Sequence, residues 1–236
     1  MIKNSKFWIA GKHTVLEALK NKNNIIYKIL LQNETKMKFI DKSFLKLVKI
    51  IKKNEINKFL KNSDISHQGF FAEIERKNTE IAKSEIFVEK NILLLDGIND
   101  QRNIGSIIRT AYAFNINLLI VNKHEFDEKS ILLNKTASGM LDRIKIYKVS
   151  NVINIIKELK KNNFWIYCFD SDANNVFQKS ILSKKNVFIF GSENKGVRKI
   201  VREASDYNIK IKINKNLDSL NVSSAVASVL TILNYN

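Results

Sequence analysis

The sequence predicts an α/β protein built around a largely parallel sheet. From about residue 91 onward, short apolar runs typical of strands are each followed by a loop and then by an amphipathic stretch typical of a helix. The chain has only seven glycines, and two of them, Gly97 and Gly191, directly follow apolar strand-like runs. In parallel sheets with right-handed crossovers, ligands bind beyond the carboxyl ends of strands, so the loops at these two glycines are candidate binding loops.

The front of the chain, residues 1–78, predicts a small α/β domain of its own. The segment GKHTVLEALKN has apolar residues at helical spacing, and the segments IIYKILLQ and HQGFFAEIE are typical of strands. Residues 36–54 are amphipathic with a strongly basic face, which predicts a helix. The polar stretch RKNTEIAKSE that follows predicts a linker at about residues 79–90.

Residues 91–236 predict the larger domain. Its predicted strands are NILLLDG, INLLIVN, FWIYCFD, NVFIFGSE and YNIKIKI, and the first is a continuous apolar run that suits a strand covered on both faces. Its predicted helices are NIGSIIRTAYAF, NVINIIKELKKN, KGVRKIVREAS and SLNVSSAVASVLTIL. Trp165, within the third strand, is predicted to be buried.

The net charge of +17 favours a polyanionic partner, with nucleic acid first and an acidic membrane surface second. Residues 1–78 carry 17 basic and 7 acidic side chains, so the front of the chain is the more basic part. A compositional bias explains the bulk charge equally well, because the chain is rich in Lys, Asn and Ile and contains no proline. No apolar run approaches the roughly 18 residues of a membrane span, and no signal peptide is recognisable at the N-terminus.

Several kinds of site are excluded by the motifs. Cys168 is the only cysteine, which excludes an internal disulfide or a cysteine-rich zinc site and suits a reducing cytoplasm. The loop from Gly191 to Gly196 is not a phosphate-binding P-loop, because Val197 and Arg198 stand where Lys and Ser/Thr are needed. No G-x-G-x-x-G or G-x-S-x-G motif is present. No metal site is expected, because the histidines lie far apart at His13, His67 and His124.

Arginine is scarce in this lysine-rich chain: only six of its 40 basic residues are arginines. One of them, Arg109, directly follows two isoleucines in a predicted helix, where lysine would carry the same charge. A guanidinium differs from an ammonium in presenting a planar fork that binds a phosphate or carboxylate through two hydrogen bonds. We therefore expect Arg109 to bind such a group, and the alternative is an ion pair with an acid near the helix end.

Three segments, LLLDGINDQRNIGSIIRTA, VFIFGSENKGVRKIVREASD and IKINKNLDSLNVSSAVASVL, resemble in order the three signature motifs of the SpoU/TrmH class of the SPOUT methyltransferases. This class transfers a methyl group from S-adenosylmethionine to a ribose 2′-hydroxyl of structured RNA. IAGKHTVLEAL and HQGFFAEI are similar to the two ends of the L30e-like RNA-binding domain that precedes the methyltransferase domain in many members. The resemblance implies a C-terminal parallel-sheet domain with a trefoil knot, an L30e-like front domain and a homodimer.

The resemblance also implies roles for individual residues. In the first two motifs Asn103, Arg109 and Glu193 match catalytic positions, and Gly191 matches the loop that contacts the cofactor. In the third motif Ser219 and Asn221 match the polar pair at the reaction centre, and Ile211 and Leu220 match contacts to the adenosine part. The third motif departs from the family pattern, because Lys212 stands in place of a common proline and NKNLD in place of a Gly-containing turn.

Each implied role has a structural alternative. Asn103, Ser219 and Asn221 are also suitable helix caps, and Glu193 is also typical of a surface acid in a turn. Arg198 is expected either to contact RNA phosphate or to pair with a nearby acid on its own helix. Arg109 either accepts the proton of the ribose hydroxyl or binds the neighbouring phosphate, and its high pKa favours the phosphate.

The sequence thus predicts a cytoplasmic, dimeric RNA 2′-O-methyltransferase. The front domain and the length resemble the members that methylate a guanosine of large-subunit (23S) rRNA, and a tRNA target is the nearest alternative. A non-catalytic RNA-binding assembly factor on the same fold is the alternative from another functional class. The presence of all the polar residues of the motifs argues against that alternative.

Overall fold

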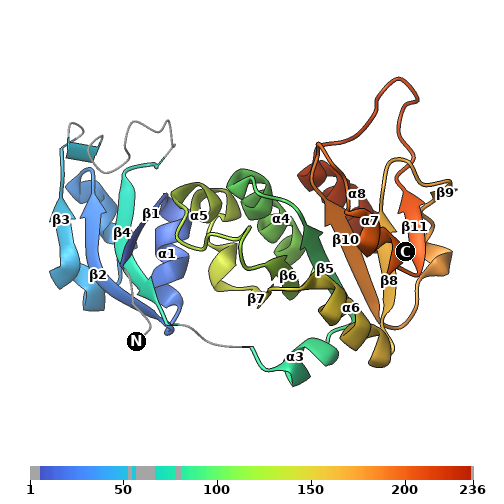
Figure 1. The fold of residues 1–236 in the computed structure, drawn as a ribbon. Coiled ribbons are helices and arrows are strands. Elements are labelled where there is room, and N and C mark those ends of the chain that lie inside the picture. Colours follow the sequence, from blue (N-terminus) through green and yellow to red (C-terminus); the bar gives the residue numbers. More distant parts are fainter. Residues whose placement is uncertain (1–5, 53–54, 57–66, 78–80, 235–236) are drawn as a thin grey trace. The chain divides into compact units, whose positions relative to one another are not determined.

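A computed structural model describes the chain except for residues 1–5, 53–54, 57–66, 78–80 and 235–236 (Figure 1). The chain divides into two compact units. The first comprises residues 1–79 together with 128–142, and the second comprises residues 80–127 and 143–236. The end of the predicted 36–54 helix and the start of the predicted linker lie outside the described residues.

The first unit contains, within the described residues, a four-stranded mixed sheet in the order β1-β4-β2-β3. Its strands are β1 (Phe7–Ala10), β2 (Asn24–Leu31), β3 (Val48–Ile50) and β4 (Phe70–Arg76). The central strand β4 pairs antiparallel with β1 and with β2, while β3 pairs parallel with β2. Helix α1 (Lys12–Lys20) packs its apolar face on this sheet, because Val15 and Ala18 are buried together with Ile9, Ile29 and Ala72.

Residues 128–142 join the first unit through a buried polar cluster. They form α5 (Ile131–Ala137) and the short helix η3 (Met140–Asp142). Arg76, at the end of β4, donates to Asp142 and, at 2.8 Å, to the side-chain oxygen of Asn134. Asn21 and Asn24 also donate to Asp142, at 3.0 and 2.8 Å. The nearly inaccessible Asp142 carboxylate is therefore fully partnered, as a buried charge must be.

The second unit contains, within the described residues, a seven-stranded sheet in the order β7-β6-β5-β10-β8-β11-β9. Every neighbouring pair in it is parallel, which confirms the predicted fold class. Its strands are β5 (Asn91–Asp96), β6 (Leu118–Asn122), β7 (Lys145–Val149), β8 (Trp165–Phe169), β9 (Asn175–Val176), β10 (Asn186–Gly191) and β11 (Tyr207–Lys210).

Helices cover both faces of this sheet, so its central strands are apolar on both sides. One face packs against α3 (Lys83–Phe87), α6 (Val152–Lys161) and α7 (Lys199–Glu203) through a single apolar cluster. On the other side, α4 (Gln101–Ala113) packs against α8 (Val222–Asn234), which in turn contacts β10. The central strands β5 and β10 are accordingly buried almost throughout.

Two structural predictions are wrong. Residues 36–54 form no α-helix among their described members; the segment contains η1 (Glu34–Phe39), η2 (Lys42–Leu47) and β3. Trp165 is 44 % exposed: it is the first residue of β8, at the amino end of the strand, and its ring contacts that of Tyr207. No helix within the described ranges is long and apolar enough to cross a membrane.

Candidate active site

A cavity of about 550 Å³ lies at the carboxyl ends of β8 and β10. Its walls come from the loop after β8, the loop after β10, the segment after β11 and the first turns of α8. Five of the eight site residues expected from the sequence line it: Gly191, Glu193, Ile211, Ser219 and Leu220. The binding loops are thus at the sheet edge where parallel α/β proteins bind ligands.

Gly191 is required by a close approach of two backbone segments. A Cβ atom built on it would lie 2.1 Å from the carbonyl carbon of Gly196 and 2.2 Å from the nitrogen of Val197. The loop closes on itself through a hydrogen bond of 2.8 Å from the Gly196 amide to the Ser192 carbonyl. Gly196 itself has a φ of 62°, in the left-handed region that favours glycine. Both glycines of the loop are therefore fixed by backbone geometry.

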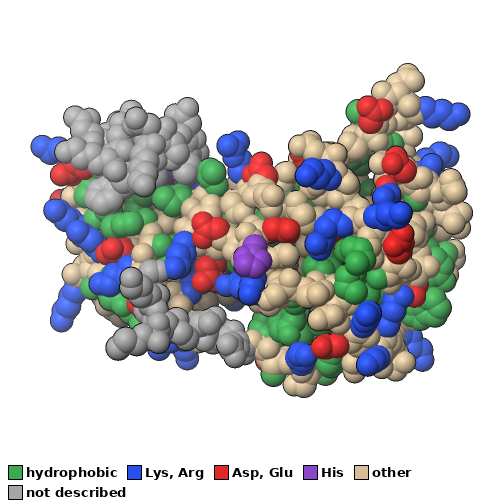
Figure 2. All heavy atoms as spheres, viewed as in Figure 1, with side chains coloured by type: hydrophobic (Ala, Val, Ile, Leu, Met, Phe, Trp, Pro, Cys, Tyr) green, Lys and Arg blue, Asp and Glu red, His purple; other side chains and the backbone are tan. Residues whose placement is uncertain are grey.

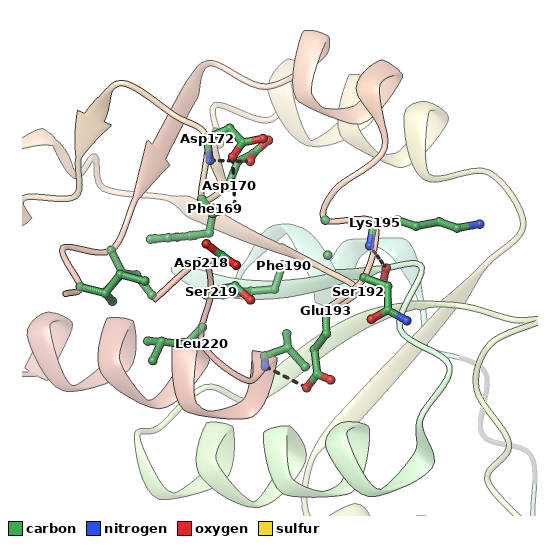
Figure 3. Close-up of a pocket in the computed structure, with 18 of the residues that line it drawn as sticks. Phe169, Asp170, Asp172, Phe190, Ser192, Glu193, Lys195, Asp218, Ser219 and Leu220 are labelled. Atoms are coloured by element: carbon green, nitrogen blue, oxygen red, sulfur yellow. Dashed lines mark hydrogen bonds between the residues drawn. The ribbon is translucent and has the colours of Figure 1, made fainter. Parts of the chain in front are cut away.

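The carboxylate of Glu193, in the second motif segment, is bound by groups from the first and third motif segments. Its Oε1 atom accepts hydrogen bonds from the side-chain amides of Asn103, at 3.1 Å, and of Asn221. Figure 3 shows Glu193 pointing from the loop after β10 toward the start of α8, where the Val222 amide lies 3.4 Å from the same oxygen. Asn221 also donates to the side-chain oxygen of Asn103 at 3.1 Å. We call Asn103, Glu193 and Asn221 the amide–carboxylate cluster.

Asn221 caps α8, as the structural alternative expects, and also contacts Asn103 and Glu193. Its side-chain oxygen accepts from the Ser223 amide at 3.0 Å and from the Ser223 hydroxyl at 2.6 Å, directly before the first residue of α8. Its side-chain NH2 donates to the cluster, so capping and site geometry depend on one amide. Asn103 does not cap α4, because the cap is Asp100, which accepts from the Arg102 amide at 2.8 Å.

Arg109 does not line the cavity of its own chain. It lies six residues after Asn103 on α4, so its side chain leaves the helix on a different face. It is exposed, and no ion pair joins it to an acid within the described residues. The alternative of an ion pair at the helix end therefore finds no support in the described part of the chain.

The inner wall of the cavity is aromatic and its mouth is acidic. The rings of Phe169 and Phe190 stack with centroids 4.7 Å apart. Figure 3 shows Asp218 and Ser219 on the wall beside Phe190, and Asp170 and Asp172 at the end of β8. Asp170 is partnered, since it accepts a hydrogen bond of 2.7 Å from Arg202. That bond raises the pKa of the Arg202 guanidinium.

Sequence reasoning missed the contact that joins the first and second motifs, between Asp96 and Arg198. Asp96, the fully buried last residue of β5, accepts from the Arg198 backbone amide at 3.0 Å and from its guanidinium Nε at 2.8 Å. The bonded carboxylate raises the pKa of Arg198. The available signal was an acid directly after a wholly apolar strand. Such a residue is buried and requires a charged partner.

Glu125 lies beside this pair. Burial raises the pKa of its carboxyl, and the nearby Asp96 acts in the same direction. Its Oε2 atom accepts a hydrogen bond of 3.0 Å from Gly97, which partly opposes the shift. The Glu125 backbone carbonyl accepts from the Gln101 side chain at 2.8 Å, so this residue supports the loop that leads into α4.

The described residues contain no group of three His, Cys, Asp or Glu side chains arranged for a metal ion. His67 is engaged in local contacts: its Nδ1 accepts from the Gly69 amide at 2.9 Å, and its ring contacts Phe71. Burial raises the pKa of the Cys168 thiol to about 12, so it has no thiolate character at neutral pH.

Two family patterns together match most of the chain. The SpoU rRNA Methylase family matches residues 90–231, and the RNA 2′-O ribose methyltransferase substrate-binding domain matches residues 8–80. The chain is 37% identical over 190 residues to an uncharacterized tRNA/rRNA methyltransferase of Borreliella burgdorferi, covering 75% of this chain and 82% of that protein. It is 33% identical over 132 residues to the 23S rRNA (guanosine-2′-O-)-methyltransferase RlmB of Nitrosomonas europaea, covering 56% of this chain and 51% of that protein.

Among solved structures, the fold is similar to that of the SpoU methyltransferase AviRb from Streptomyces viridochromogenes in complex with AdoMet. The TM-score is 0.76 at 18% identity, with 97% of this chain and 89% of that chain covered. The parallel sheet, the order of the motif segments and the two family matches agree with one another. The chain therefore belongs to the SpoU family of S-adenosylmethionine-dependent RNA 2′-O-ribose methyltransferases.

Proposed function

We propose that this protein methylates the ribose 2′-hydroxyl of a guanosine in large-subunit (23S) rRNA, and that the amide–carboxylate cluster is its reaction centre. The observation that supports the centre is the convergence of the Asn103, Glu193 and Asn221 side chains beside the cavity. These residues come from three segments that are distant in the sequence. Packing stability gives no reason for three polar side chains to meet at an accessible edge of the sheet.

The cavity fits S-adenosylmethionine in size and in lining. A volume of about 550 Å³ lies within the roughly 300–1,000 Å³ of small-molecule sites. Phe169, Phe190, Ile211 and Leu220 provide apolar surface for an adenosine group, and the carboxylates of Asp172 and Asp218 suit a ligand with ammonium and sulfonium charges. Gly191 keeps the loop after β10 in its closed path. When bound, the cofactor supplies an electrophilic methyl group on sulfur.

The protein contributes alignment and proton handling. In-line displacement requires the ribose oxygen to be held in position, and well-oriented reactants lower the barrier by several kcal/mol, roughly 7–11 in the best cases. The Glu193 carboxylate is fixed in orientation by Asn103 and Asn221, and within the described residues its Oε2 atom accepts no hydrogen bond. We propose that this oxygen accepts the hydroxyl proton, directly or through water.

In this proposal Arg109 binds the phosphate next to the target ribose. The guanidinium stays protonated at neutral pH and therefore serves better as an anion-binding fork than as a base. Its exposure and its lack of an acidic partner in the described part of the chain leave the fork available to RNA.

We also propose that the protein forms a homodimer with a second copy of the chain. The packed helices α4 and α8 leave Tyr112 and Ile232 39 % and 38 % exposed, and an apolar helix pair of this kind supports the homodimer proposal.

The choice of rRNA rests on the front unit and on the similarity to RlmB. A tRNA target is the second candidate, because the B. burgdorferi relative is named for both classes of RNA. A non-catalytic assembly factor is disfavoured, since such a protein has no need to keep Asn103, Glu193 and Asn221 in mutual contact. We expect the protein to act in the cytoplasm, where these RNAs are made and processed.

The test supplies the purified protein with methyl-labelled S-adenosylmethionine and, in separate reactions, unmodified 23S rRNA and tRNA. Nucleoside analysis of the digested RNA then identifies the labelled product. We expect 2′-O-methylguanosine from one position in 23S rRNA. Label in tRNA alone would replace the rRNA proposal by the tRNA candidate, and label on a base would contradict the proposed chemistry.

A further inference from the structure

The net charge of the chain does not indicate which part of the surface binds RNA. Figure 2 shows lysine and arginine side chains scattered over the visible face of each unit rather than gathered in one stripe. Several lysines and arginines of the described residues already have acidic partners; for example, Lys20 pairs with Glu17 at 2.7 Å and Lys83 with Glu158 at 2.8 Å. An RNA-binding surface is therefore better sought where lysines lie together without such partners.

One surface of the first unit meets this condition. It lies where the chain leaves β1 at Gly11 and β2 at Gln32, and enters β4 at Gly69, and these three points are adjacent. The Gly11 amide donates to the Phe70 carbonyl at 2.9 Å, and the Gln32 amide donates to the Gly69 carbonyl at 3.0 Å. The side chains that project here are Lys12, Lys36, Lys38, Phe39 and Lys135, which we call the Phe39 patch.

Contacts between these side chains define the patch. The Lys12 ammonium lies 3.6 Å from the centroid of the Phe39 ring, and the Lys38 ammonium lies 5.3 Å from it. Phe39 rests edge-on against Phe70, with centroids 6.1 Å apart, and Lys36 lies 5.6 Å from the Phe70 ring. Phe70 is buried, whereas Phe39 is 41 % exposed. An exposed aromatic ring is thus held on a buried one and surrounded by ammonium groups.

The lysines of the patch are available to an anion. Within the described ranges none of the four makes an ion pair with an acid. The Lys135 ammonium lies 3.1 Å from where a Gly11 Cβ would be, and its partial burial lowers the pKa of the amine. Glu34 is the nearby acid on η1, and Asp41 is engaged by Ser43 through two hydrogen bonds. Among the described residues, positive charge therefore dominates around Phe39.

We propose that the Phe39 patch binds an unpaired nucleotide of the RNA substrate, with its base stacked on Phe39 and the flanking phosphates on the surrounding lysines. Sequence-specific RNA recognition usually targets unpaired bases, which stack on aromatic side chains. The Lys12 ammonium lies over one face of the Phe39 ring, and this cation–π contact of a flexible side chain is weak. A base stacks more strongly on such a ring, so the lysine is free to move to the adjacent phosphate. The inference rests on the proposed function, because it assigns the patch to that RNA.

The test uses full-length protein and a hairpin RNA whose unpaired loop carries 2-aminopurine, a fluorescent base that stacking quenches. We expect binding of the wild-type protein to quench the fluorescence. Phe39→Ala should abolish the quenching and weaken binding roughly 5- to 100-fold, whereas Phe39→Tyr should retain both because it keeps the ring. Melting temperature and S-adenosylmethionine binding, measured on each variant, should equal those of the wild type.

The lysines are tested through salt dependence. Lys12→Ala should lower the slope of log affinity against log salt concentration by about one, as expected for one lost phosphate contact. Lys20→Ala is the matched control, since Lys20 lies on the same helix and is already paired with Glu17, and it should leave the slope unchanged.

If Phe39→Ala bound the hairpin with unchanged affinity and quenching, the proposal that the Phe39 patch binds a nucleotide would be wrong. The methyltransferase proposal would be unaffected. A wild-type protein that binds S-adenosylmethionine but neither binds nor methylates RNA would overturn both.

Discussion

The side-chain amide of Asn103 donates a hydrogen bond of 3.1 Å to the carboxylate of Glu193, although 90 residues separate the two in the sequence. The bond joins the start of α4 to the loop after β10, and Asn221 adds the start of α8. A carboxylate held by two side-chain amides has a fixed orientation, which is what a group that receives a proton from a positioned hydroxyl requires.

Asn221 is expected to contribute separately to stability and to catalysis. Asn221→Ser keeps an N-cap oxygen but loses the NH2 group that binds Glu193, so stability should be retained while methyl transfer falls roughly 10- to 100-fold. Asn221→Ala should lose the same activity and, in addition, about 1 kcal/mol of unfolding free energy. Thermal unfolding and initial rates measure the two effects. Wild-type rates in the serine variant would assign Asn221 to capping alone.

Arg109→Lys tests the need for a guanidinium fork. The variant should fold and bind S-adenosylmethionine normally, because Arg109 is exposed and has no ion pair within the described residues. Loss of the bidentate contact should lower methyl transfer by about 100-fold. Arg102→Lys, at another exposed position of α4, is the control and should keep most of the activity. Comparable rates for Arg109→Lys and the wild type would contradict the proposal that a guanidinium fork is needed at this position.

The contact between Asp96 and Arg198 is expected to stabilise the loop after β10. Arg198→Ala leaves the buried Asp96 carboxylate without its guanidinium donors, which should lower the free energy of unfolding by about 1–3 kcal/mol. Lys199→Ala is the neighbouring control. Its pair with Glu203 is exposed on both sides and 3.8 Å long, so its loss should cost less than about 0.5 kcal/mol. Urea denaturation measures the free energy of unfolding of the two variants. Equal losses in both would mean that the Asp96–Arg198 contact stabilises the fold no more than an exposed ion pair does.

Glu125 predicts a pH dependence. Its pKa in the folded protein is raised above the usual value, so the folded state holds the proton more tightly than the unfolded state does. Its stabilising contribution is therefore present at pH values below the usual glutamate pKa and is lost as the pH rises through the folded pKa. Glu125→Gln imitates the protonated form and keeps the Gly97 hydrogen bond. It should raise the melting temperature at neutral pH and lose this advantage near pH 4; a constant difference across this range would contradict the assignment.

The sequence predicted the second unit well where its signals are local. The segments that became β5, α4, α6 and β10 are long apolar or amphipathic runs, and such runs specify element type reliably. Residues 36–54 failed because their basic amphipathic pattern is interrupted by Asp41, which starts a new turn by bonding Ser43. Residues 123–150 carried no pattern that was interpreted, yet they contain α5 and β7. The association of 128–142 with the first unit depends on Arg76, Asn134 and Asp142, which are distant in the sequence.

The motifs indicated which segments form the candidate site but not its geometry. The motifs indicated Asn103, Glu193 and Asn221, yet only the folded chain brings their side chains together at one carboxylate oxygen. The capping alternative for Asn103 is wrong, since Asp100 precedes it and caps α4. The Asp96–Arg198 contact was not predicted, because ion pairs between distant segments depend on the order of strands in the sheet. Local sequence patterns do not encode that order. The implied trefoil knot and homodimer stay predictions.

The most direct measurement of the central claim is the single-turnover rate of Glu193→Gln with saturating S-adenosylmethionine and RNA. Glutamine keeps the size of the side chain and an oxygen for Asn103 and Asn221 but is a far weaker proton acceptor. Glu203→Gln, an exposed change on α7, is the matched control. The account predicts unchanged binding of both ligands and a rate lowered by roughly 100-fold or more in Glu193→Gln alone. A Glu193→Gln enzyme that transfers methyl at the wild-type rate would contradict it.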